Sequence, residues 1–280
     1  MNAHYIVNIN MIFRKIFFIV IICFSSCSKE ESDGIPAFIN IDSIVLNDNI
    51  TDNITDAWVY VNDNLQGVYE LPVKFPILEE GDHNIRIKAG IKENGIAATR
   101  IRYPFYSSYT IENLRLQKDS TTIINPVVDY LDGLTYFQEN FEGVGMNLES
   151  TDISDTSVII INEQNMNYGA GILHDSLLTF EIATTELTDL PGANAAVYLE
   201  LDYKCNTEFL IGVYINYPIV VQRDLLWVTP KDDWNKIYVN LTSTITESVN
   251  APSFSVFLGM KRNFELDTNI INFDNLRVIY

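Results

Sequence analysis

Most of the chain alternates apolar and polar residues with the two-residue period of a β-strand. Runs rich in Val, Ile, Tyr and Phe are separated by Asn, Asp and Gly turns, and no amphipathic helix longer than two turns is indicated. The clearest alternation lies at 197–204, where Val197, Leu199, Leu201 and Tyr203 fall on one face. One apolar and one mixed face per strand predicts pairs of packed antiparallel sheets, so we expect an all-β fold.

A first β-sandwich domain is predicted at 36–128. A strand at 57–61 leads into a polar turn that ends at Gly67, and a second turn at Gly81 feeds another alternating run. This hairpin, the Pro72 that follows it and the second turn resemble a PEGA-like module. The resemblance implies a small, Ig-like β-sandwich that serves as a spacer or as a binding platform.

A linker is predicted at 129–136. Pro126 biases the residue before it toward extended geometry, and Asp132-Gly133 is typical of a turn. The remaining residues, 137–280, form the predicted second domain.

Three phrases in the second domain carry a resemblance to a known fold family. They are ENFEG at 139–143, DWNKIY at 233–238 and NFDNLRV at 272–278. Together they resemble the galactose-binding-like jelly rolls that serve as carbohydrate-binding modules. The resemblance implies that the second β-sandwich is a jelly roll, but it leaves the ligand open, since non-catalytic and structural relatives share these phrases.

The start of the chain, 1–27, has the pattern of an export signal. Arg14 and Lys15 precede nine apolar residues, and then come Ser25, Ser26 and Cys27. Nine helical residues rise about 14 Å against the roughly 30 Å of a bilayer core, so a permanent transmembrane helix is not expected.

The residues that end at Cys27 resemble a lipobox, which implies a bacterial lipoprotein that carries lipid on this Cys. The alternative is ordinary cleavage beside an incidental Cys. The acidic segment 28–35 resembles the export signal of surface lipoproteins of Bacteroidota, although a plain solvated tether has the same composition. We therefore expect a lipid-anchored protein of the outer membrane, exposed at the cell surface if that signal is real.

Charge and cysteine content narrow the partners. The formal net charge is −19, and loss of the signal would remove two basic residues and no acidic ones. This charge argues against nucleic acid and against an anionic membrane surface, so the lipid would be the membrane contact. Of three cysteines, Cys23 would leave with the signal and Cys27 would carry lipid, so Cys205 has no partner for an intramolecular disulfide and is expected in the core.

The sequence contains none of the motifs G-x-S-x-G, H-E-x-x-H or C-x-x-C, so we do not expect an enzyme. The jelly-roll resemblance implies a structural calcium ion that joins the first strand to the last, and the matching positions are Asn140, Glu142 and Asp274. The alternative is that these side chains only pair with backbone amides at strand ends.

Exposed aromatic and polar side chains could hold a sugar. The candidates are Tyr214, Tyr217, Arg223 and Trp227, which lie in or beside a loop between two predicted strands. Packing in the core is the alternative for each aromatic residue. Trp234 matches a position that is usually buried in such strands, so we expect it in the core.

The sequence thus favours a membrane-anchored, non-catalytic lipoprotein that binds a glycan or another cell-surface polymer through its second domain. The alternative is a structural, assembly or adhesin lipoprotein that contacts envelope proteins. A glycoside hydrolase or lyase is a third hypothesis, supported only by the many carboxylates.

Overall fold

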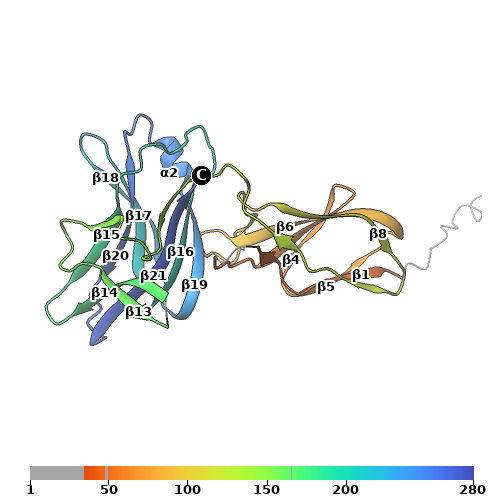
Figure 1. The fold of residues 1–280 in the computed structure, drawn as a ribbon, viewed down its shortest axis with the longest axis horizontal. Helices are drawn as coiled ribbons and strands as arrows, with labels where there is room; N and C mark the ends of the chain where they lie inside the picture. Colours follow the sequence, from red (N-terminus) through yellow and green to blue (C-terminus); the bar gives the residue numbers. More distant parts are fainter. Residues whose placement is uncertain (1–34, 48–49, 165) are drawn as a thin grey trace, which may run out of the picture.

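The computed structural model describes residues 35–47, 50–164 and 166–280. Figure 1 shows two β-sandwiches, one formed by the first half of the chain and one by the second. The predicted signal, the lipobox with Cys27 and nearly all of the acidic tether lie outside the described residues. The all-β prediction is confirmed, because the one helix among the described residues is the short α2, Thr242–Glu247.

The first sandwich is built from ten strands in three hydrogen-bonded groups. The larger sheet has the order β4-β3-β6-β7 with β8 also on β6, the smaller has the order β5-β1-β9, and β2 pairs with β10. The strands are β1 Ala37–Ile41, β2 Val45–Leu46, β3 Asp56–Val61, β4 Asn64–Glu70, β5 Val73–Ile77, β6 Gly81–Lys92, β7 Arg100–Arg102, β8 Ser108–Leu116, β9 Thr121–Ile123 and β10 Val127–Val128.

The second sandwich has a six-stranded and a five-stranded sheet. The first follows the order β13-β14-β21-β16-β19 with β11 on β21, and the second follows β12-β15-β20-β17-β18. The strands are β11 Tyr136–Glu139, β12 Leu148–Ser150, β13 Ile159–Glu163, β14 Met166–His174, β15 Thr179–Thr184, β16 Tyr198–Cys205, β17 Phe209–Ile215, β18 Val221–Val228, β19 Lys231–Asn240, β20 Phe254–Lys261 and β21 Thr268–Ile279.

Strand β16 shows how the sequence produces this sandwich. Leu199, Leu201, Tyr203 and Cys205 point into the core between the two sheets, as the alternation predicted. Cys205 is a buried free thiol among the described residues. The residues between them point away from that core, onto the outer face of the six-stranded sheet.

The first sandwich packs against this outer face. The hydrophobic core of the first sandwich continues into Tyr198, Tyr238 and Ile279, which lie on strands of the six-stranded sheet. Between the sandwiches, β10 ends at Val128 and β11 begins at Tyr136. Part of the outer face of the six-stranded sheet is therefore covered by the first sandwich.

Within the described ranges, none of the helical structure is both long and apolar enough to span a bilayer.

Candidate functional site

The outer face of the six-stranded sheet brings polar side chains of three neighbouring strands together. In the strand register, Asp202 of β16 lies opposite Lys236 of β19 and opposite Asp274 of β21. Directly opposed residues in antiparallel strands share a face of the sheet. The three side chains therefore form a row across the sheet, next to the first sandwich.

A β-bulge in β21 adds a fourth polar group to this row. Phe273 and Leu276 both point into the core although they are three residues apart, because the pairing with β16 shifts register here and Asn275 has a φ of +48°. The extra residue leaves Asp274 and Asn275 together between two inward-facing residues. Bulges commonly re-aim side chains in this way beside functional sites.

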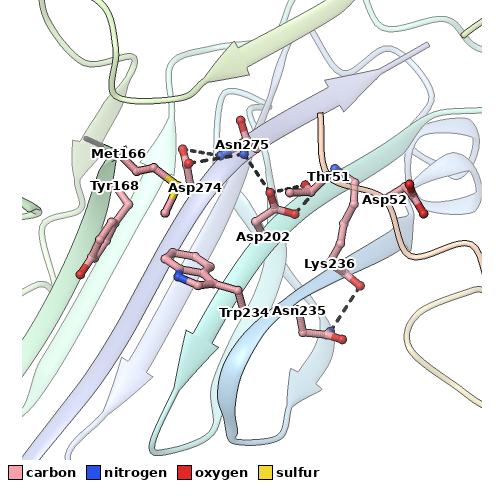
Figure 2. Close-up of a pocket in the computed structure, with 10 residues that line it drawn as sticks. All are labelled: Thr51, Asp52, Met166, Tyr168, Asp202, Trp234, Asn235, Lys236, Asp274 and Asn275. Carbon is pink, nitrogen blue, oxygen red and sulfur yellow. Dashed lines mark hydrogen bonds and ion pairs between the residues drawn. The ribbon is translucent and has the colours of Figure 1, made fainter. Parts of the chain in front are cut away.

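These residues form the floor of a pocket of about 290 Å³ (Figure 2). Its walls come from distant parts of the chain: Met166 and Tyr168 from β14, Trp234 and Asn235 from β19, and Thr51 and Asp52 from the segment before β3. The pocket thus combines residues of both sandwiches.

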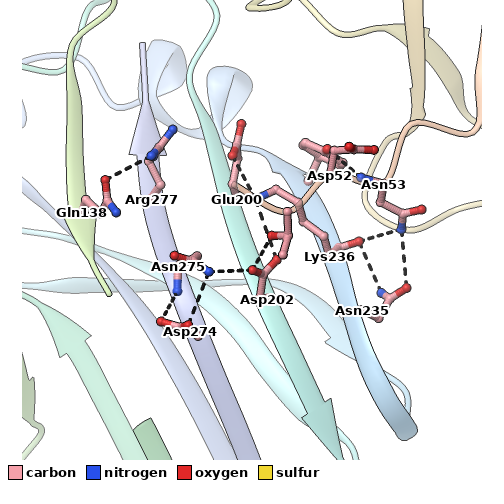
Figure 3. A network of polar contacts seen from close by, with 12 residues as sticks. Asp52, Asn53, Gln138, Glu200, Asp202, Asn235, Lys236, Asp274, Asn275 and Arg277 are labelled. Carbon is pink, nitrogen blue, oxygen red and sulfur yellow. Dashed lines mark hydrogen bonds and ion pairs between the residues drawn. The ribbon is translucent and has the colours of Figure 1, made fainter. Parts of the chain in front are cut away.

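Asp202 and Lys236 lie at the bottom of the pocket, and each is only 4% exposed. One oxygen of Asp202, Oδ2, accepts hydrogen bonds from Thr51 Oγ1 and, at 2.8 Å, from Asn275 Nδ2. Its other oxygen, Oδ1, lies 3.8 Å from Lys236 Nζ. Figure 3 shows this network.

The two facing atoms of this pair are not satisfied. Neither Asp202 Oδ1 nor Lys236 Nζ has a hydrogen-bond partner among the described residues. Lys236 Nζ is 3.2 Å from Glu200 Oε2, which is an ion-pair distance, but the contact lacks hydrogen-bond geometry. A buried acceptor and a buried donor without partners are costly, and such a pair at a pocket floor indicates a place for a polar ligand group.

Asp274 is also electrostatically perturbed. The pKa of Asp274 is raised to about 7, chiefly by burial; the negative charges of Asp202, Glu142 and Glu139 add to this shift, and the Asn275 backbone N–H opposes it. This carboxyl group therefore changes charge near neutral pH.

Two aromatic rings form one wall. Tyr168 and Trp234 meet edge to face with 5.3 Å between ring centroids, and the Lys204 ammonium lies 5.4 Å from the Trp234 ring centroid and 5.7 Å from that of Tyr168. The prediction that Trp234 lies in the core is wrong, because its side chain points to the outer face and is 37% exposed.

Next to the pocket, the interface between the sandwiches is built around Glu200. Tyr103 and Tyr130 of the first half donate hydrogen bonds to its carboxylate at 2.6 and 2.8 Å. Tyr106 and Tyr238 share a hydrogen bond of 3.0 Å between their hydroxyls. Burial, followed by the charge of Glu200, raises the pKa of Tyr103 well above its ordinary value, so this phenol stays a neutral donor.

The four predicted sugar-binding residues lie on or beside the five-stranded sheet, away from this pocket. Trp227 is 47% exposed and lies opposite Leu210, while Tyr214 is four residues further along β17, about 13 Å at strand spacing. The Tyr214 hydroxyl donates to Glu181 Oε1 at 2.5 Å. The two aromatic residues are therefore on the same face of the sheet but too far apart to contact each other.

The other two candidates also bind within the chain. The Tyr217 hydroxyl donates to the Val249 carbonyl at 3.1 Å, and Arg223 forms an ion pair with Glu247 at 2.8 Å. Sugar binding by these residues stays a prediction.

The three predicted calcium ligands lie near β21 but bind protein donors. Glu142 accepts hydrogen bonds from the backbone and side-chain amides of Asn167, Asn140 Oδ1 accepts from the Glu142 backbone, and Asp274 accepts from the Asn275 backbone. In the described part of the chain, no three His, Cys, Asp or Glu side chains converge as a metal site. Calcium binding at these positions stays a prediction.

No protein-family model matches this chain, and no curated protein matches it in sequence. Solved carbohydrate-binding modules match about half of it. A family 11 module from Clostridium thermocellum, in complex with a β-1,3-1,4-mixed-linked tetrasaccharide, is 15% identical over 51% of this chain and 94% of its own, with a TM-score of 0.37. A family 29 module complexed with mannohexaose is 10% identical over 52% of this chain and 92% of its own, with a TM-score of 0.36. At these scores the likeness assigns no ligand to this chain.

Two signals in the sequence point to the pocket. The first is the three-residue spacing of Phe273 and Leu276, which breaks the alternation and indicates a bulge with two exposed polar residues. The second is that Trp234 is in phase with the charged Lys236, whereas Ile237 and Val239 occupy the other face of the same strand. The contribution of Thr51 has no sequence signal.

Proposed function

We propose that this chain is a non-catalytic glycan-binding protein, and that the pocket between its two sandwiches holds a sugar ring. The proposal keeps the function expected from the sequence and moves the site from the five-stranded sheet to the outer face of the six-stranded one.

The unsatisfied pair at the pocket floor carries this proposal. Asp202 Oδ1 can only accept a hydrogen bond while it is ionised, and Lys236 Nζ can only donate one. A hydroxyl group both donates and accepts, so one sugar hydroxyl placed between these atoms would satisfy both. One oxygen could bridge the 3.8 Å between them, and because both atoms are buried in this structure, it would reach them only after the two side chains turn toward the pocket.

The aromatic wall supports the same ligand class. The faces of Trp and Tyr rings carry partial negative charge, to which the C–H groups of a sugar ring are complementary. Trp234 and Tyr168 flank the polar floor formed by Asp202, Asp274 and Asn275. A sugar ring, with C–H groups on its faces and hydroxyls at its edge, matches an apolar wall next to a polar floor.

Membrane attachment and lack of catalysis belong to the proposal too. The signal-like start and Cys27 support a lipid anchor in the outer membrane. The absence of a catalytic motif in the sequence supports a binding role, and an assay of released reducing ends with any bound glycan tests it. Binding without hydrolysis is the expected result.

A glycan array probed with the full chain tests the binding itself. Trp234→Ala is expected to weaken binding by about tenfold or more, ~1.4 kcal/mol, because it removes the ring that contacts the sugar. Phe264→Ala, which removes an exposed aromatic ring outside the pocket, is the matched control and should bind normally. Loss of binding in Trp227→Ala, with Trp234→Ala unaffected, would instead place the site on the five-stranded sheet.

One observation favours the alternative of a protein partner. Three consecutive apolar residues, Ile219, Val220 and Val221, are exposed where β17 connects to β18, with exposed fractions of 82, 56 and 45%. Exposed apolar patches often mark protein contacts. If no glycan binds, a triple Ser variant at these positions tests whether capture of envelope proteins depends on this tip.

A further inference from the structure

The pocket begins where the first sandwich ends on the sheet. Along the outer face of β16, Tyr198 and Glu200 are buried under the first sandwich, while Asp202, the next residue on that face, lines the pocket. On β19, Tyr238 lies in the interface and Lys236 lines the pocket. A ligand on this face therefore cannot extend across the part of the sheet that the first sandwich covers.

The segment 51–53 of the first sandwich is hydrogen-bonded to the six-stranded sheet and forms one wall of the pocket. Asn53 donates through its backbone N–H to the Tyr238 hydroxyl at 3.1 Å and through its side chain to the Lys236 carbonyl at 2.8 Å. Thr51 Oγ1 donates to Asp202. These three bonds anchor both ends of the short stretch 51–53, whose residues Thr51 and Asp52 border the pocket.

The opposite side is also closed. Strands β14 and β19 are separated by β21 and β16, yet Tyr168 and Trp234 approach to 5.3 Å between centroids, so the rings bridge the sheet. Figure 2 shows these rings on one side of the pocket, Thr51 on the other, and the polar floor between them. The volume of about 290 Å³ is at the lower end for ligand pockets and suits a single ring.

The charges of the pocket lining restrict the class of sugar that can bind. The pocket lining contains three carboxyl groups, of Asp52, Asp202 and Asp274, and one ammonium group, of Lys236, so acidic groups outnumber basic ones. Like charges in a partly enclosed site strongly disfavour binding. A neutral or an amino sugar is therefore favoured over a uronic acid or a sulfated sugar.

We propose that the pocket binds the terminal neutral or amino sugar of a glycan chain, and that the first sandwich supplies the wall that prevents the chain from passing through. This inference rests on the proposed glycan-binding function. It differs from binding along the interior of a polysaccharide, which needs a groove that is open at two ends.

The test uses an array that presents neutral, amino and acidic sugars as monosaccharides, short oligosaccharides and long linear polymers. Calorimetry on the full chain then measures affinity and stoichiometry for each chain length that binds. If the pocket recognises a chain end, the Kd per mole of glycan chain should be the same at every chain length. Each linear chain should then bind one protein molecule. Several proteins per polymer, with affinity that rises with chain length, would overturn this inference and leave glycan binding standing.

Thr51→Tyr tests the wall. The bulkier side chain would narrow the pocket from the first sandwich, so affinity should fall by about tenfold or more. Thr121→Tyr, at an exposed Thr of β9 in the same sandwich, is the matched control. Equal affinity of both variants would show that the first sandwich forms no part of the site and would refute the inference. If no sugar on the array binds, the proposed function itself fails. If a sugar binds but Trp234→Ala binds it normally, the pocket is not the site and this inference fails with it.

Discussion

Replacing Lys236 by Met removes a buried ammonium group that is the counterion of two carboxylates. Its Nζ lies 3.2 Å from Glu200 Oε2 and 3.8 Å from Asp202 Oδ1. Within the described ranges, no other cation is at ion-pair distance from either carboxylate. The variant therefore leaves two buried negative charges beside each other without a positive one.

Breaking a buried ion pair by removing one partner costs about 3–5 kcal/mol, because the remaining charge is desolvated and uncompensated. We expect a loss of this size in the free energy of unfolding for Lys236→Met. Glu200→Gln should cost less, about 1–3 kcal/mol, because Lys236 keeps Asp202 as a counterion. The Gln oxygen can also accept from Tyr103 and Tyr130, whose hydroxyls lie 2.6 and 3.1 Å from Glu200 Oε1.

Urea unfolding of the full chain, followed by tryptophan fluorescence, measures both variants. Lys231→Met is the control, since this Lys is exposed on the same strand and its loss should change stability by no more than about 0.5 kcal/mol. The reasoning is refuted if Lys236→Met is no less stable than Lys231→Met, or if Glu200→Gln is the more damaging change of the two buried sites.

Three further predictions concern single sites. Because its pKa is raised to about 7, Asp274 contributes stability that is fully present below its ordinary pKa of 3.8 and is lost as pH rises through about 7. The stability of Asp274→Asn relative to wild type should therefore increase by ~1–2 kcal/mol between about pH 5 and 8, a value reduced to allow for the partial exposure of this side chain. Thermal melts with a calcium chelator present measure this, and a difference that does not change with pH would contradict it. Gly212→Ala should cost about 1–3 kcal/mol in urea unfolding, since the new Cβ would collide with Phe257 and lie 2.7 Å from the Arg223 carbonyl. Burial raises the pKa of Cys205, so peptide mass spectrometry should find it unmodified by iodoacetamide in the native protein and alkylated in urea.

The sequence was sufficient for the fold class because strand alternation is a local property. Leu199, Leu201 and Tyr203 point into one core as their two-residue spacing predicted. Trp234 was predicted in the core from its match to a family pattern, although its spacing from Lys236 indicates the outer face. The family pattern has a buried residue at the position of Trp234, and it does not reveal that in this chain the outer face of the sheet is accessible there.

The pocket could be predicted only in part, because its walls come from residues far apart in the chain. Asp202, Lys236 and Asp274 lie on strands that the sequence indicates, but their order in the sheet follows from topology, not from proximity along the chain. Thr51 reaches Asp202 across 151 positions. No periodicity or local motif encodes a contact of that kind.

Lys236 connects the domain interface to the proposed binding site. It pairs with Glu200, which accepts a hydrogen bond from Tyr103 of the first sandwich, and it faces Asp202 on the pocket floor. A ligand hydroxyl that bonds to Lys236 and Asp202 would give the Lys236 ammonium group a hydrogen-bond partner. The same ammonium group pairs with Glu200 in the contact between the two sandwiches. A ligand that binds only the native state stabilises that state. If the proposed site binds a sugar, binding would therefore also stabilise the packing of the two sandwiches through Lys236.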